Sequence, residues 1–229
     1  MLTWNFDLVP VAGFSHSIVA GAIESPRSMA NEGGAIDVSG GGYWQLELRR
    51  AQLYGESAEG HRLWLRYRAE LDGGAGKIVI PLIDDLLAAP VATTFSDGTP
   101  FSDGTSFVSA AVAAEFATAA PLAAGTVTLA AWGDRLPREG DVFAVDHAGK
   151  SWHAYQIRDI DSVVAGSGGV STVTVSIRPT LREATPARAV ADFYRPRCVF
   201  RLPAGASMAW EPEKYWRATP TVRFVEALR

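Results

Sequence analysis

The stretch that decides the fold runs from Gly40 to Asp85 and reads GGGYWQLELRRAQLYGESAEGHRLWLRYRAELDGGAGKIVIPLIDD. In its first part, Trp44, Leu46 and Leu48 alternate with polar side chains. A period of two residues is typical of a strand with one buried face and one face in water. The stretch therefore begins with a half-buried strand.

The middle of the stretch changes to helical spacing. Leu63, Trp64, Tyr67 and Leu71 fall on one stripe, and the positions between them are mostly charged. This pattern predicts an amphipathic helix over residues 56–71. The Asp-Gly-Gly sequence that follows tolerates a left-handed backbone, so we expect it to end the helix.

The last part of the stretch is a nearly unbroken apolar run over residues 77–83, and it contains Pro81. Proline has no N–H to donate to a neighbouring strand, so this strand is expected to lie at the edge of its sheet or to bend at Pro81. A sheet carrying one long helix is thus the predicted nucleus of the fold.

Composition limits the class of protein. With 229 residues, 48% of them hydrophobic and 20% charged, the chain is expected to fold as a soluble globular protein with a proper core. A net charge of -4 provides no basic field for phosphates, so direct nucleic-acid binding is not expected. A single cysteine, Cys198, excludes an intramolecular disulfide and an all-cysteine metal cage. The first residues lack the pattern of a secretion signal, and no run reaches about twenty apolar residues, so we expect no membrane span and folding in the cytosol.

Two segments of the N-terminal half leave alternatives open. Trp4, Phe6 and Leu8 alternate with polar residues, which predicts an opening strand or arm. The segment 25–42 is rich in glycine, serine and proline and encloses a short strand over 35–38. It is either a hairpin or a mobile connection that becomes ordered against a neighbouring subunit.

An internal repeat follows, with FSDGT at 95–99 and again at 101–105. Each copy places Asp-Gly where a tight turn requires it, so two successive turns explain the repeat. Asp97 and Asp103 are a conceivable calcium pair, but the other acidic ligands of a calcium loop are missing. We therefore expect no metal there.

From residue 125 onward the pattern is that of short strands separated by turns. The clearest alternation is VTVSI at 173–177, and an alanine-rich segment at 108–124 fits helix by composition but strand by its later alternation. The sequence predicts a mainly β protein, a sandwich or barrel with one flanking helix and a second β subdomain.

Catalytic motifs are not found. The chain has no Gly-x-Ser-x-Gly nucleophile turn and no phosphate-binding loop. His147 and His153 flank one predicted hairpin without a third ligand, so we interpret them as partly exposed loop histidines rather than a zinc site. Asp84, Asp85 and Glu47 have no fixed separation that would indicate a glycosidase pair. No enzymatic activity, cofactor or metal is expected.

The seven tryptophans differ in their predicted roles. Trp44, Trp64 and Trp152 lie on patterned faces, for which burial in a core is the simple interpretation. Trp210 and Trp216 flank a charged loop instead. They form either a capped edge of the core or an aromatic platform for a sugar or another subunit.

Several segments together carry a resemblance to a known family. They are GGYWQLEL at 41–48, the helix 58–71, the Gly-Gly turn into the strand that ends IPL at 80–82, GDVFAV at 140–145, the strand 152–157, VTVSIRP at 173–179 with Leu181 and Arg182, and RCVFRL at 197–202. With these segments the sequence resembles the tailed-phage tail-tip proteins known as distal tail proteins, which are also found in phage-like gene transfer agents.

The resemblance implies a structural virion protein of a siphophage-like tail tip. The implied architecture is a tail-tube-like β domain over 1–120 that includes the helix 56–71, followed by a β-rich C-terminal subdomain over 121–229. The implied assembly is a homo-oligomer, a hexameric ring between the tail tube protein and the tail hub protein of the baseplate. DNA is implied only as a passenger through the lumen, and the protein is implied to assemble in the host cytoplasm.

Candidate assembly contacts follow from exposed edges, arms and aromatic loops, because a ring of heterologous contacts needs such surfaces. They are Trp4, Pro81, Phe95, Asp97, Phe101, Asp103, Trp210 and Trp216. The alternative function is a carbohydrate-binding β-sandwich module for recognition of the host surface, using the C-terminal tryptophans.

Overall fold

The structure is a computed structural model of the chain. It describes residues 1–24, 35–37, 40–53, 58–71, 74–82, 112–132, 135–166, 169–210 and 217–228. The chain forms two compact units. Unit 1 comprises residues 1–81 and 198–229, and unit 2 comprises residues 82–197.

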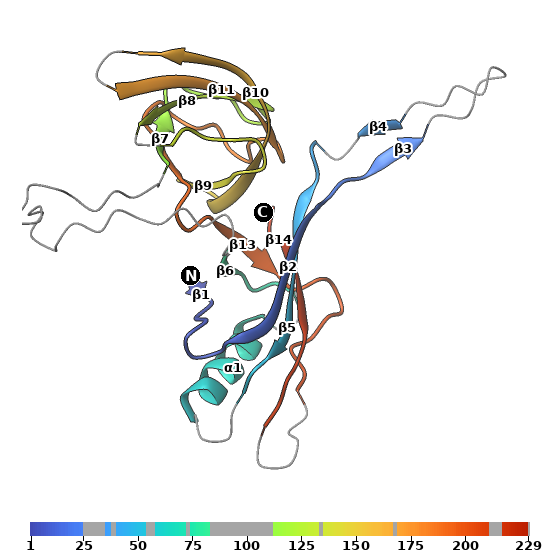
Figure 1. Ribbon diagram of the computed structural model, residues 1–229. Coiled ribbons are helices and arrows are strands. Elements are labelled where there is room, and N and C mark those ends of the chain that lie inside the picture. Colours follow the sequence, from blue (N-terminus) through green and yellow to red (C-terminus); the bar gives the residue numbers. More distant parts are fainter. Residues whose placement is uncertain are drawn as a thin grey trace, which may run out of the picture. The chain divides into compact units, whose positions relative to one another are not determined.

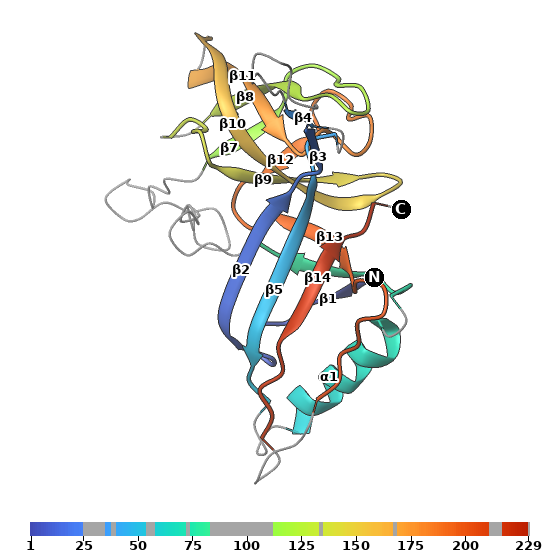
Figure 2. The ribbon, with the colours of Figure 1, turned by 90° about the vertical axis from the view of Figure 1, so that its right-hand side faces the viewer.

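Unit 1 is built on a six-stranded mixed sheet. Its strands in spatial order are β1 (Leu2–Thr3), β6 (Ile78–Pro81), β13 (Arg197–Arg201), β14 (Val222–Glu226), β5 (Tyr43–Ala51) and β2 (Val11–Val19). β1 runs parallel to β6, whereas β13, β14, β5 and β2 pair antiparallel. Figure 2 shows β14, β5 and β2 side by side, with β2 at the border of the sheet.

One helix, α1 (Ala58–Leu71), packs on this unit. Its buried stripe contains Trp64, Tyr67 and Leu71, and the inward side chains of β5 are buried as the sequence predicts. The helix ends where predicted, because Gly74 has a positive φ of 74° and its N–H donates to the Leu71 carbonyl at 3.0 Å. No helix in the described part of the chain has the length and apolarity needed to cross a membrane.

The hairpin formed by β2 and β5 continues as a separate two-stranded ribbon. β3 (Ala22–Glu24) pairs antiparallel with β4 (Ala35–Asp37), and Figure 1 shows this ribbon projecting beyond the six-stranded sheet. At the base of the ribbon, Gly42 has a φ of 89°, and a Cβ there would lie 2.5 Å from the Val19 carbonyl oxygen. β4 confirms the short strand expected there over residues 35–37, and its pairing with β3 fits a hairpin; residues 25–34 and 38–39 of this segment lie outside the described residues, so both alternatives stay open.

Unit 2 is a closed six-stranded barrel. Its strands in order around the barrel are β10 (Ser151–Ala165), β11 (Val170–Arg178), β8 (Thr126–Trp132), β7 (Ala113–Phe116), β12 (Val190–Asp192) and β9 (Val142–His147). The fifteen-residue β10 closes the barrel by pairing with β9 through its first part and with β11 through the rest. The prediction of a mainly β fold with a barrel and one helix is confirmed.

Inward side chains fill the barrel. Val173 and Val175 of β11 pair with the buried residues Leu129 and Val127 of β8, and Ile177 pairs with Ile157 of β10, as the period of two predicts. An aromatic group completes this core. It consists of Phe116, Phe143, Tyr155 and Phe193, with ring centroids 5.2–6.5 Å apart between neighbours.

The division of the chain differs from the predicted boundary near residue 120. Unit 2 already begins at residue 82, and the C-terminal strands β13 and β14 return to the sheet of unit 1. Residues 121–229 therefore do not form one subdomain. The barrel is inserted between the parts of unit 1, an arrangement set by pairing between distant segments.

Candidate assembly edge

The border strand β2 pairs with β5 on one side only within the described sheet. We call its nine residues, Val11–Val19, the β2 edge. An edge strand presents backbone N–H and C=O groups that can pair with another strand. The opposite border, β1, has only two residues, so the β2 edge is the long open side of this sheet.

The side chains on the inner face of the β2 edge prolong the core of unit 1. Phe14, His16 and Ile18 lie opposite buried residues of β5, but they are themselves only half-buried. The ring centroids of Phe14 and His16 are 5.5 Å apart, and those of His16 and Trp44 are 5.6 Å apart. The core thus reaches the border of the sheet as an aromatic and aliphatic row that is incompletely covered.

The outer face of the same strands is polar. Ser15 and Ser17 lie in a shallow polar depression with Glu47 and Arg223. The two Glu47 carboxylate oxygens each accept a hydrogen bond of 3.1 Å, one from Arg223 and one from Arg49. These hydrogen bonds, with Arg223 contributing most, hold the pKa of Glu47 below its usual value. Over residues 14–18, the apolar surface of the β2 edge is therefore confined to the inner face.

The β3–β4 ribbon adds a second unsupported feature beside the β2 edge. A two-stranded ribbon without a third strand or a helix against it is marginally stable in water. In the described part of the chain, the ribbon is a sheet of its own. A neighbouring molecule that covered the β2 edge and the ribbon would supply the missing support.

The structure places three of the predicted contact residues. Trp4 is 2% exposed and lies in the core, so its side chain offers no surface to a partner. Pro81 is half-buried at the end of β6, and β1 pairs only with Ile78 and Val79 of that strand. β6 is therefore the second strand of the sheet, next to the border strand β1. Pro81 lies beyond the residues of β6 that pair with β1, so its missing N–H removes no hydrogen bond from the β1–β6 pairing.

Trp210 is the third, and it is half-buried. Its ring packs at 5.3 Å, edge to face, on the ring of His61 in α1. The capped core edge is the alternative that this contact favours. The other predicted contacts lie outside the described residues, and they are Phe95, Asp97, Phe101, Asp103 and Trp216.

Sequence reasoning missed the β2 edge, because the N-terminal alternation was assigned to residues 4–8 and was ended at the following proline and glycine. In the structure, residues 6–9 are turn and bend, and the long strand begins at Val11. A signal was present in the FSHSI sequence of residues 14–18, where large and small side chains alternate. Serine, histidine and glycine made that alternation weak on any hydrophobic scale.

The interpretation of His147 and His153 as partly exposed loop residues is wrong. His147 ends β9 and is 5% exposed, while His153 lies within β10 and is 0% exposed. Their ring centroids are 5.9 Å apart. The strands simply extend further than the predicted turn allowed, so both rings lie on paired strands instead of in a loop.

His147 belongs to a buried hydrogen-bonded chain in the barrel. Its Nε2 lies 2.7 Å from the Tyr155 hydroxyl, and that oxygen also accepts the backbone N–H of Arg182 at 3.1 Å. Burial, followed by the neighbouring His153, lowers the pKa of His147 from its usual 6.5 to about 4. A neutral imidazole whose Nε2 accepts the tyrosine proton fits this arrangement.

We expect this histidine to make the barrel sensitive to mild acid. In the folded state His147 has a lower pKa than in the unfolded chain, so between pH 6.5 and about 4 the unfolded chain binds the proton more readily. The contribution of neutral His147 to the stability is therefore complete above pH 6.5 and is lost as the pH falls toward about 4. The expected loss is about 2 kcal/mol, discounted for partial solvent screening. Urea unfolding of the native chain and of His147→Gln at pH 7 and pH 4.5 measures it. If the native chain and His147→Gln lose the same stability between pH 7 and pH 4.5, the loss comes from groups that both proteins share, such as carboxylates. That result would contradict the role of His147.

No protein-family model matches the chain, and no curated protein matches it either.

Proposed function

We propose that this chain is a structural subunit that assembles side by side with copies of itself in a ring, as a component of the tip of a phage-like tail. The observation that carries the proposal is the β2 edge, a nine-residue border strand whose inner face is half-covered core. A second copy placed against it would pair the open backbone and cover the apolar row in one step.

The two borders of the sheet are unlike surfaces, so a contact of the β2 edge with any surface other than a second β2 edge would be heterologous. They differ in length and direction, since β1 has two residues parallel to β6 while β2 has nine antiparallel to β5. A contact between unlike surfaces repeats head to tail, and it closes into a ring when the rotation permits. The resemblance to distal tail proteins supplies the setting, with the tail tube protein and the hub protein as neighbours above and below.

Catalysis and a bound cofactor have no part in this proposal, and the mild negative charge suits a conduit that must not retain DNA. The sugar-binding alternative depends on two exposed tryptophans acting together. Trp210 packs on the helix, and Trp216 lies outside the described residues, so that function stays a prediction.

Mass measurement and imaging test the proposal. Native mass spectrometry and negative-stain microscopy of the purified chain, alone and mixed with the tail tube protein and the hub protein, are expected to reveal a ring of identical subunits. A chain that stays monomeric at every concentration, in both settings, would overturn the proposal. A monomer that also binds glycans through the C-terminal tryptophans would favour the alternative.

A further inference from the structure

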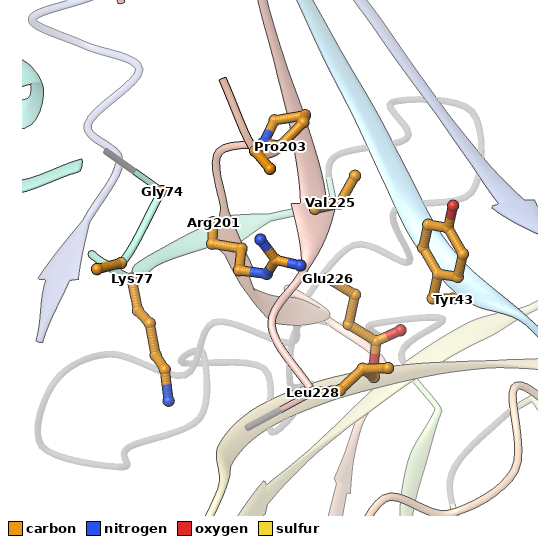
Figure 3. Close-up of a pocket in the computed structure, with 10 residues that line it drawn as sticks. Tyr43, Gly74, Lys77, Arg201, Pro203, Val225, Glu226 and Leu228 are labelled. Atoms are coloured by element: carbon orange, nitrogen blue, oxygen red, sulfur yellow. The ribbon is translucent and has the colours of Figure 1, made fainter. Parts of the chain in front are cut away.

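A second surface of unit 1 has the form of a ligand site. A pocket of about 710 Å³ opens near the ends of β5, β13 and β14 and the turn that follows α1. Figure 3 shows the Arg201 side chain extending across the middle of this pocket, with Lys77 to one side and Tyr43 to the other. The volume lies in the range of sites that bind small molecules.

The two cations of the pocket, Lys77 and Arg201, have no ion-pair partner in the described part of the chain. No described carboxylate lies within 4 Å of the Lys77 ammonium or the Arg201 guanidinium. The hydrogen bond of Arg201 is a long one, 3.4 Å to the carbonyl of the next residue. Two cations and the Tyr43 phenol therefore line one space with most of their donors unused.

The charge and the apolar lining indicate which anion fits. Glu226 also lines the pocket, so two cations face one carboxylate and the net charge of the lining is +1. The Glu226 carboxylate accepts the Trp44 N–H at 3.0 Å, and in Figure 3 it points away from the guanidinium. Pro203, Val225 and Leu228 add apolar surface beside the cations. A single negative charge next to an apolar group matches this lining better than the two charges of a phosphate.

We infer that this pocket binds an organic carboxylate through the Arg201 guanidinium, with the apolar part of the ligand against Val225 and with the Lys77 ammonium adding attraction from one side of the pocket. The planar guanidinium can donate two parallel hydrogen bonds to the two oxygens of a carboxylate. Such a carboxylate can come from a small molecule or from an acidic side chain of a polypeptide. This inference does not rest on the proposed ring.

Ligand-observed NMR titration of the purified chain tests the site with defined probes. Hexanoate is expected to bind, whereas hexanamide and inorganic phosphate are expected to bind at least tenfold more weakly. Acetyl-Leu-Asp-Leu-amide and its asparagine counterpart form a second arm. Tighter binding of the acidic peptide than of hexanoate would identify a polypeptide as the source of the carboxylate, and the reverse order would identify a small molecule.

Arg201→Gln is expected to weaken hexanoate binding about tenfold, since it removes the charged donor that binds the carboxylate. Lys77→Gln is expected to weaken it less, by about two- to threefold, because it removes a charge that acts from one side of the pocket. Arg66→Gln, which removes an exposed cation from α1, is the matched control and should leave binding unchanged. Equal binding of hexanoate and hexanamide, equal binding by Arg201→Gln, Lys77→Gln and the native chain, or no binding of either acidic probe would overturn the inference. Failure of the ring would leave these results unaffected, because the β2 edge contributes no residue to the pocket.

Discussion

Replacing Trp4 with alanine is expected to lower the free energy of unfolding of unit 1 by about 3–5 kcal/mol, the usual cost of removing a large buried aromatic side chain. Trp4 is 2% exposed and stacks on Tyr67 with ring centroids 5.0 Å apart. Trp64 and Phe224 approach it edge to face at 6.1 and 6.0 Å. One indole thus joins the helix to the sheet, and its loss leaves a cavity between them.

The backbone around Trp4 adds to this expectation. The Trp4 N–H donates to the Val79 carbonyl at 2.9 Å, and the Tyr67 hydroxyl donates to the Thr3 carbonyl and accepts the Asn5 N–H. Without the indole, the segment that carries β1 loses the packing that keeps these hydrogen bonds in place. The largest effect is therefore expected on unit 1 as a whole.

Urea unfolding followed by circular dichroism measures the loss, because the signal does not depend on the removed tryptophan. Trp132→Ala is the matched control, since Trp132 is 40% exposed on the barrel and should cost less than about 1 kcal/mol. Trp4→Phe should cost less than half as much as alanine, because its ring fills much of the space that alanine leaves empty. The indole Nε1 that both variants remove has no hydrogen-bond partner among the described residues, so its loss breaks no hydrogen bond. A loss below about 1 kcal/mol for Trp4→Ala would contradict the central place of this residue.

The central position of Trp4 shows where sequence reasoning ends. An aromatic residue at position 4 suggests part of an arm, and nothing nearby in the sequence indicates that the rings of Tyr67 and Phe224 will enclose it. The strand at 43–51 and the helix at 58–71 were predictable, because each carries its own period within one continuous segment. A residue such as Trp4, which is buried by side chains distant in the sequence, leaves no periodic pattern in its own segment.

The domain division failed for the same reason. Glu47 and Arg223 are hydrogen-bonded neighbours on β5 and β14, although 176 residues separate them in the sequence. The strand β14 falls within the series of short strands expected from residue 125 onward, but its pairing with β5 was not predicted. When the sequence is followed in order, a C-terminal strand is assigned to the subdomain just before it. In the structure β14 pairs with β5, in the sheet of unit 1.

For the candidate site, the sequence predicted the type of surface, an open sheet border, but not the strand that forms it. The expectation that an open sheet border serves assembly remains a prediction, but the border is β2 instead of the strand with Pro81. Edge strands are half-buried, so their hydrophobic alternation is weaker than that of central strands. The pocket around Arg201 draws residues from separate elements, and no spacing in the sequence could bring Lys77, Tyr43 and Arg201 together.

Replacing Ile18 with lysine is expected to abolish side-by-side assembly while leaving the single subunit folded. Ile18 is half-buried on the inner face of the β2 edge, opposite Trp44. In a single subunit, the aliphatic part of a lysine can cover that ring while the ammonium reaches water past the border. In an assembled ring the same ammonium would be enclosed by the neighbouring copy without a partner, which is how natural edge strands prevent pairing.

The expected result is a rise of the dissociation constant for self-association by roughly a hundredfold or more, equivalent to about 3 kcal/mol. Sedimentation velocity over a range of concentrations measures it, and circular dichroism verifies that the fold persists. Leu65→Lys is the matched control, because Leu65 is 49% exposed on α1 and lies outside the β2 edge. If Ile18→Lys and Leu65→Lys form rings equally well, the β2 edge is not the contact, since a buried unpaired ammonium cannot be accommodated without cost.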